Sequence, residues 1–176
     1  MNEYFFNLTG VNLVWYEITD WLGISAIVVC MLFTITGLVQ LVKRKSLFKV
    51  DSEIVSLGVL YIIVFGVYLF FEIVPVKYRP IIIPGCTAPE PSFPSTHTMI
   101  VCVIMGSALM VLDKYIQNDN LRKTLLVILT AIIIVTVIGR SISEVHWLTD
   151  IIGGVLISAS LLTFFYLIVR LSRERS

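Results

Sequence analysis

The sequence has little charge and few residues that could form a soluble surface. Only 14% of its 176 residues are charged, whereas 57% are hydrophobic. A soluble domain of this length keeps too large a surface-to-volume ratio to bury so much apolar side chain. The composition therefore excludes an ordinary soluble domain and indicates a protein dissolved in a bilayer. The net charge of +1 gives no reason to expect nucleic acid as a partner.

Cysteines, linkers and early cations are also scarce. The three cysteines are an odd number, which disfavours a disulfide framework. No Gly/Ser/Pro-rich linker divides the chain, so we expect one domain. Neither lysine nor arginine precedes Lys43, and a signal peptide needs a basic start, so we expect no cleavable signal peptide.

Five hydrophobic runs are long enough, or nearly long enough, to cross a bilayer, which requires about 20 apolar residues. They predict an all-α integral membrane helical bundle, with residues 21–176 as one membrane-embedded domain. Residues 1–20 carry apolar side chains at helical spacing and predict an outer interfacial amphipathic helix, with a frayed terminus as the alternative. The five runs are Trp21–Val42, Ile54–Val76, Thr96–Leu112, Thr124–Ser143 and Thr149–Arg170.

The distribution of cations predicts the orientation of the bundle. With five spans, the lysines and arginines after the first, third and fifth runs fall on one side, which the positive-inside rule makes cytoplasmic together with the C-terminus. The loops after the second and fourth runs then face outward. These outward loops contain only three cations, Lys77, Arg79 and Arg140. The positive-inside rule disfavours cations on this side, so their presence needs another explanation.

Both histidines of the chain, His97 and His146, lie at the outward ends of spans, in the same layer as these three cations. A histidine can transfer a proton near neutral pH or act as a nucleophile. Arginine clamps phosphate oxygens, and lysine adds a point charge. The set predicts a site for an anionic substrate. Taken singly, the outward cations could instead be snorkelling interfacial side chains.

Two local patterns support this site. Ser95 is a candidate N-cap of the third span, and a helix N-terminus beside His97 suits phosphate. His146 and Asp150 are four residues apart, so one helical face can hold both, and the carboxylate could then orient the imidazole. The alternatives are a capping serine beside a solvated boundary histidine, and a His–Asp surface pair of little energetic value.

Two chemical alternatives use the same residues. His97, His146 and Asp150 could bind zinc with an open position, but a cation-rich cage repels a divalent metal. A Ser–His–Asp hydrolase built on Ser95 is the weaker alternative, because nothing resembles a nucleophile elbow.

Taken together, the segments resemble the type 2 phosphatidic acid phosphatase superfamily, whose motifs are K-x6-R-P, P-S-G-H and S-R-x5-H-x3-D. The chain departs from them in three places: Glu72 stands where the family has lysine, Thr96 replaces the glycine, and Gly139 replaces the serine before the arginine. Lys77 could supply the missing charge from another place. The matching residues are Arg79 and Pro80, residues 94–97 with the one change, and Arg140, His146 and Asp150.

The resemblance implies a lipid phosphatase that needs neither metal nor cofactor, and the usual family plan of six spans, the first of which the N-terminal segment could replace. It implies that His146 attacks phosphorus to give a phosphohistidine, that Asp150 orients His146, and that His97 protonates the leaving oxygen. The residues implied to hold the phosphoryl oxygens are Arg79, Arg140, Ser95, Thr96 and Lys77.

The expected partners are the lipid bilayer and a membrane lipid phosphate, such as phosphatidate, phosphatidylglycerophosphate or a polyprenyl diphosphate. The sequence does not choose among these lipids and does not give the oligomeric state. A lipid phosphotransferase on the same scaffold and a non-enzymatic anion-binding membrane protein are the remaining functional hypotheses.

Overall fold

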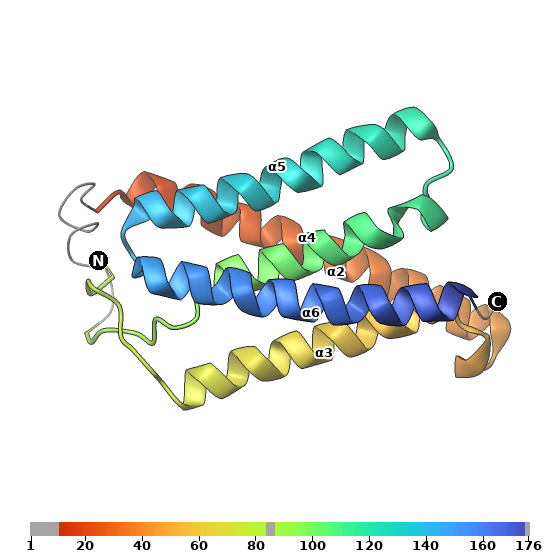
Figure 1. Cartoon of the computed structure of the whole chain (residues 1–176), viewed down its shortest axis with the longest axis horizontal. Coiled ribbons are helices and arrows are strands. Elements are labelled where there is room, and N and C mark those ends of the chain that lie inside the picture. Colours follow the sequence, from red (N-terminus) through yellow and green to blue (C-terminus); the bar gives the residue numbers. More distant parts are fainter. Residues whose placement is uncertain (1–10, 84–86, 175–176) are drawn as a thin grey trace.

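The structure, a computed structural model, describes residues 11–83 and 87–174. Five of its helices are long and apolar enough to cross a membrane, which confirms the predicted all-α membrane bundle. The described residues contain no β-strand, only an isolated bridge between Tyr78 and Pro91. In chain order the elements are α2 (Leu13–Arg44), the short 3₁₀ helix η1 (Leu47–Lys49), α3 (Ser52–Ile73), α4 (Thr96–Tyr115), α5 (Asp119–Ser143) and α6 (Leu148–Glu174) (Figure 1).

Helix α2 begins earlier than the hydrophobic run predicts. Asn12 is its N-cap and accepts a hydrogen bond from the backbone N–H of Trp15, at 3.3 Å. The helix then continues without a break to Arg44, where Lys45 adopts a left-handed conformation. Residue 20 is therefore not a helix boundary. The rest of the predicted interfacial helix, residues 1–10, lies outside the described residues.

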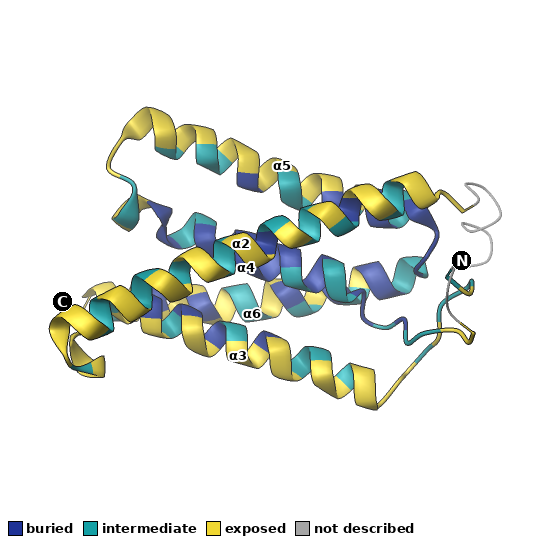
Figure 2. Ribbon diagram, turned by 180° about the vertical axis from the view of Figure 1, so that it is seen from behind, coloured by how far each residue is buried: buried dark blue, intermediate teal, exposed yellow. Residues whose placement is uncertain are grey.

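Helix α4 forms the centre of the bundle. In its most hydrophobic stretch 67% of the residues are buried, against 6–22% in the other four spanning helices. Figure 2 shows the same contrast, with buried residues concentrated on α4 and exposed residues on the outward faces of the surrounding helices. Those exposed side chains are mostly large and apolar, as a lipid environment requires. Core residues that α4 contributes include Met99, Val101, Val103, Met105 and Val111.

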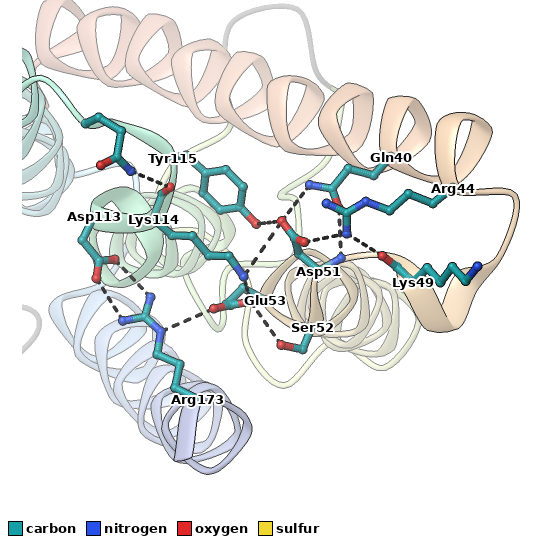
Figure 3. A network of polar contacts seen from close by, with 11 residues as sticks. Gln40, Arg44, Lys49, Asp51, Ser52, Glu53, Asp113, Lys114, Tyr115 and Arg173 are labelled. Atoms are coloured by element: carbon teal, nitrogen blue, oxygen red, sulfur yellow. Dashed lines mark hydrogen bonds and ion pairs between the residues drawn. The ribbon is translucent and has the colours of Figure 1, made fainter. Parts of the chain in front are cut away.

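A polar network joins four helices at one end of the bundle (Figure 3). Glu53 of α3 is almost fully buried and accepts from Lys114 Nζ of α4 at 2.6 Å and from Arg173 Nε of α6 at 3.4 Å. Asp51 accepts from Arg44 Nη1 of α2 at 2.8 Å. Charge-assisted hydrogen bonds of this kind fix the relative positions of helix ends. Several cations that the sequence assigns to the cytoplasmic side thus have a structural partner as well.

The opposite end of the bundle contains the segments that the sequence selects for chemistry. Successive spanning helices run in alternate directions, so the start of α2, the end of α3, the start of α4 and the α5–α6 turn lie at this end (Figure 1). The long α3–α4 connection packs over the same end, and its Tyr78 carbonyl accepts a hydrogen bond from Trp147 Nε1 at 2.9 Å. We call this end of the molecule the site end.

Candidate active site

His146 lies in the sharp turn between α5 and α6. Helix α5 stops because Glu144 adopts a left-handed conformation, with φ of 56°. The turn buries His146 and brings its Nδ1 to 3.1 Å from the carbonyl oxygen of Ser92. A carbonyl only accepts hydrogen bonds, so Nδ1 carries the hydrogen and the lone pair of the neutral ring is on Nε2. This is the tautomer that nucleophilic attack through Nε2 requires.

The electrostatic surroundings keep His146 neutral. Burial lowers the pKa of His146 well below its ordinary value of 6.5, and the positive charges of Arg79 and Arg140 lower it further. The Nε2 atom is buried and has no hydrogen-bond partner among the residues that the structure describes. His146 therefore presents an unprotonated nitrogen beside two guanidinium groups.

Asp150 does not contact His146 as the i, i+4 spacing predicts. The expectation of a shared helical face was wrong, because α6 begins only at Leu148 and His146 precedes it in the turn. Ser92 lies between the two. Its hydroxyl donates a short hydrogen bond to Asp150 Oδ2, and the Ser92 Oγ atom is 3.5 Å from His146 Nδ1. The carboxylate is thus connected to the imidazole through a serine.

Asp150 also organises the start of α6. Its Oδ2 accepts from the backbone N–H of Trp147 at 3.0 Å, as the third residue of a helix does in a capping box. Its backbone oxygen accepts from the N–H of Ser95 at 2.9 Å. Gly154 allows a close approach at the same junction, because a Cβ added there would lie 2.9 Å from the Ser95 carbonyl oxygen. These contacts fix the start of α6 to the start of α4.

His97 lies in the first turn of α4, as predicted, but Ser95 does not cap that helix with its side chain. Ser95 occupies the N-cap position, yet its hydroxyl is paired with Thr98 Oγ1 at 3.0 Å. His97 Nε2 contacts Asp20 Oδ1 at 3.1 Å. Its Nδ1 is buried with no hydrogen-bond partner within the described part of the chain. Each histidine of the site therefore has one ring nitrogen held and one unpaired.

Arg140 is fully buried at the end of α5. Its Nη2 donates a short hydrogen bond to Asp20, and its guanidinium lies 4.7 Å from the centre of the Tyr16 ring. The nitrogens Nε and Nη1 have no hydrogen-bond partner among residues 11–83 and 87–174. A buried guanidinium with two free donors is costly unless an acceptor is supplied, and a phosphoryl oxygen is such an acceptor.

Arg79 and Lys77 lie close together in the chain but have different surroundings. The Arg79 side chain is 10% exposed; its Nη2 is 3.3 Å from Glu90 Oε2, and no described residue accepts from its Nε or Nη1. Lys77 instead places Nζ 4.4 Å from the centre of the Trp147 ring, a cation–π contact. Neither Lys77 nor Arg140 is among the residues that line the cavity at the site end.

One cavity of about 490 Å³ is lined by several of these groups. Its wall includes both histidines, Arg79 and Thr96, which the sequence motifs predict to be part of the site, and also Glu72 from α3. Among the described residues, six of the seven buried side-chain atoms without a hydrogen-bond partner are nitrogens of His97, His146, Arg79 and Arg140. The remaining wall is largely apolar, with Ile24, Ile27, Tyr68, Phe71, Ile100 and Val101.

Sequence reasoning missed four residues of this site: Tyr16, Asp20, Glu90 and Ser92. Asp20 and Tyr16 belong to the segment that was predicted to lie on the membrane surface. Glu90 and Ser92 belong to the α3–α4 connection, where no spacing rule singles them out. Tyr16, Asp20 and Ser92 contact groups more than 50 residues away, so the sequence carries no local signal for them. Glu90 contacts the nearer Arg79, but across a connection without regular spacing.

The two chemical alternatives find little geometric support. Within the described residues, no group of three or more His, Cys, Asp or Glu side chains is arranged to hold a metal ion. The Ser95 hydroxyl pairs with Thr98 rather than with a histidine, and it is fully buried. The unpaired nitrogens instead favour binding of an anion.

Comparison with known proteins agrees with the architecture and gives the family of the chain. The PAP2 superfamily model matches residues 54–174, so the chain belongs to the PAP2 superfamily. The chain is therefore a multi-pass membrane protein of a phosphatase superfamily. No curated protein matches the sequence. Among solved structures, the fold is similar to a transmembrane PAP2-type phosphatidylglycerolphosphate phosphatase from Bacillus subtilis, with a TM-score of 0.56 and 23% identity over 91% of this chain and 77% of that one.

Proposed function

We propose that the chain hydrolyses a phosphomonoester or a diphosphate carried by a membrane lipid, through a phosphohistidine on His146. The observation that carries the proposal is the set of buried, unpaired nitrogens of two histidines and two arginines at one end of a membrane bundle. Both histidines and Arg79 line one cavity, and Arg140 contacts Asp20, which also lines it. Membership of the PAP2 superfamily supports phosphatase chemistry but does not specify the substrate.

The first chemical step forms a bond between His146 Nε2 and phosphorus while the bond from phosphorus to the lipid oxygen breaks. The electron pair of the broken bond stays on that oxygen, which takes a proton from His97. The second step is attack by water, whose proton returns to His97 as the P–N bond breaks and phosphate leaves. Asp150, acting through the Ser92 hydroxyl, keeps the His146 ring in the required orientation.

The two arginines stabilise the charge that develops on the phosphoryl oxygens. Arg79 and Arg140 each have two unpaired nitrogens. Preorganised donors in a site shielded from water are worth far more than the same donors in solution. Thr96 and His97, in the first turn of α4, each contribute one backbone N–H group to the same oxygens. Lys77 is not included, because it stacks on Trp147.

The substrate is a lipid because the cavity wall combines these polar groups with isoleucine, valine and aromatic side chains contributed by α2, α3 and α4. The hydrocarbon part of a membrane lipid can lie against that apolar wall while its phosphate reaches the histidines. Phosphatidate, phosphatidylglycerophosphate and polyprenyl diphosphate all fit this description. The similar Bacillus subtilis structure is described as a phosphatidylglycerolphosphate phosphatase, so phosphatidylglycerophosphate is the first substrate to test.

We further propose that the site end faces outward. The opposite end carries Lys43, Lys45 and Lys49 beside α2, and Arg122 and Lys123 at the start of α5. The positive-inside rule assigns such an end to the cytoplasm. The C-terminus, after α6, lies at the same cytoplasmic end.

The test is phosphate release by purified protein from a panel of these three lipid phosphates, with His146→Ala as the control. Release by the wild type and loss by at least about a thousandfold in the variant is the expected result. Transfer of phosphate to a second lipid, without release, would make the chain a phosphotransferase. Binding of the lipids without turnover in either protein would contradict the proposal and favour a binding protein.

A further inference from the structure

Helix α2 forms one wall of the cavity, and the residues of this wall lie outside the family motifs. Tyr16, Asp20 and Gly23 are spaced by four and three residues, which places them on one helical face, and all three line the cavity. The match to the superfamily begins at residue 54, beyond the end of α2 at Arg44. This wall is therefore a feature of this chain outside the matched segment.

Asp20 contacts two of the groups that act on the substrate. Its Oδ1 accepts from Arg140 Nη2 and lies 3.1 Å from His97 Nε2. Because a carboxylate accepts, Nε2 of His97 carries a hydrogen, so the ring can donate a proton from Nδ1 only as the imidazolium, with a hydrogen on both nitrogens. Gly23 supports the same orientation, because a Cβ added there would lie 3.0 Å from His97 Cδ2. The Cδ2–Nε2 edge of the ring thus lies against α2.

The same carboxylate balances a charge that the fold has buried. The Arg140 side chain has no exposed area, whereas that of Asp20 is 38% exposed. A buried guanidinium requires a counter-charge, and Asp20 together with the face of the Tyr16 ring provides one. With Nη2 held, the unpaired Nε and Nη1 of Arg140 keep a fixed direction.

From these contacts we infer that Asp20 is a positioning residue that holds His97 as the proton donor and fixes Arg140 for the phosphoryl group. The inference rests on the proposed phosphatase function. Asp20 does not itself react: it orients the ring whose Nδ1 proton goes to the leaving oxygen as the P–O bond breaks. The role is analogous to that of Asp150 at His146, but it comes from a different helix.

A proton donor matters only when the leaving group needs a proton. An alkyl phosphate expels a strongly basic alkoxide, whereas a nitrophenyl phosphate expels a stable phenolate. General acid catalysis typically contributes about 10²- to 10⁴-fold. Asp20→Asn keeps the shape and removes the charge, so we expect kcat/KM to fall about 100-fold with the alkyl phosphate and less than about tenfold with the aryl phosphate.

The experiment compares both substrates for the wild type, Asp20→Asn, and the control Glu17→Gln. Glu17 is an exposed acid on the same helix and does not line the cavity, so its variant should match the wild type with both substrates. His97→Asn should show the same preference for the aryl phosphate. Adding Asp20→Asn to His97→Asn should then have little further effect, because the two residues act as one unit.

Equal losses with the two substrates would overturn the inference, since they indicate a structural role only. A rise in kcat/KM would also overturn the inference, because the Asp20 carboxylate would then occupy the phosphate position and compete with the substrate. If Asp20→Asn does not fold, Asp20→Glu replaces it and should show a smaller loss with the same leaving-group preference. A wild type that is inactive with both aryl and lipid phosphates would contradict the proposed phosphatase function. Failure of the proposed function is thus distinguished from failure of the inference about Asp20, which requires an active wild type.

Discussion

The junction between α4 and α6 offers a sharp test of how packing supports the site. Gly154→Ala adds a methyl group 2.9 Å from the Ser95 carbonyl oxygen and 3.3 Å from Thr98 Cβ. Ordinary contact begins at 3.4 Å, so α6 has to move away from the start of α4 by about 0.5 Å. The obstacle is backbone, which cannot rotate away as a side chain can.

The expected magnitude follows from two opposing effects. Replacing glycine by alanine within a helix stabilises it by about 1 kcal/mol, whereas overpacking costs about 1–3 kcal/mol. The net free energy of unfolding should therefore fall by up to about 2 kcal/mol. Because the shift separates Ser95 from the backbone of Asp150, activity should fall too. A misplacement of about 1 Å can cost 100-fold, so about tenfold is expected in kcat/KM.

Gly58→Ala is the matched control, because nothing lies within 4 Å of the Cβ that it adds to α3. That variant should be as stable as the wild type or more stable, with unchanged activity. Reversible unfolding in mixed micelles gives the stabilities, and phosphate release gives the rates. If Gly154→Ala is as stable and as active as Gly58→Ala, the close α4–α6 contact does not support the site and the reasoning is refuted.

Three further predictions concern the chemistry. Ser92→Ala breaks the link from Asp150 to His146 while keeping the Ser92 carbonyl, so kcat should fall about 10- to 100-fold with little change in stability; an unchanged kcat would refute this link. The pKa of His146 is lowered by burial and by Arg79, and the neutral ring attacks, so the acid limb of kcat/KM should lie below pH 6.5. Arg79→Gln should move that limb to higher pH, and a limb that does not move would contradict the assignment. Activity should survive EDTA and be inhibited by vanadate, whereas complete loss with EDTA and rescue by zinc would favour a metal enzyme.

Much of the fold is predictable because the bilayer imposes a simple length requirement. About 20 apolar residues are needed for a span, and each of the five hydrophobic runs corresponds to one helix of the structure. The exact start of α2 is not predictable in this way. It depends on the cap at Asn12, and two polar residues that follow the cap, Tyr16 and Asp20, line the cavity rather than facing lipid.

The site is only partly predictable for a different physical reason. Spacing placed His97 and His146 at the same end, but it gave the wrong geometry for Asp150 because the left-handed residue Glu144 ends α5 before the histidine. Asp20 and its partner Arg140 are 120 residues apart, and only the packing of α2 against α5 brings them together. Gly139 permits that packing, since a Cβ there would lie 2.6 Å from Thr19 Cγ2.

The central claim is that His146 attacks phosphorus through Nε2, because Nδ1 donates to the Ser92 carbonyl. The most direct measurement is to quench the enzyme during turnover of a phosphorus-labelled lipid phosphate under alkaline conditions and to map the phosphorylated residue and ring position. The account predicts phosphate on Nε2 of residue 146 in the wild type, and none after His146→Ala. Phosphate on Nδ1, on His97, or on neither histidine while phosphate is still released, would contradict it.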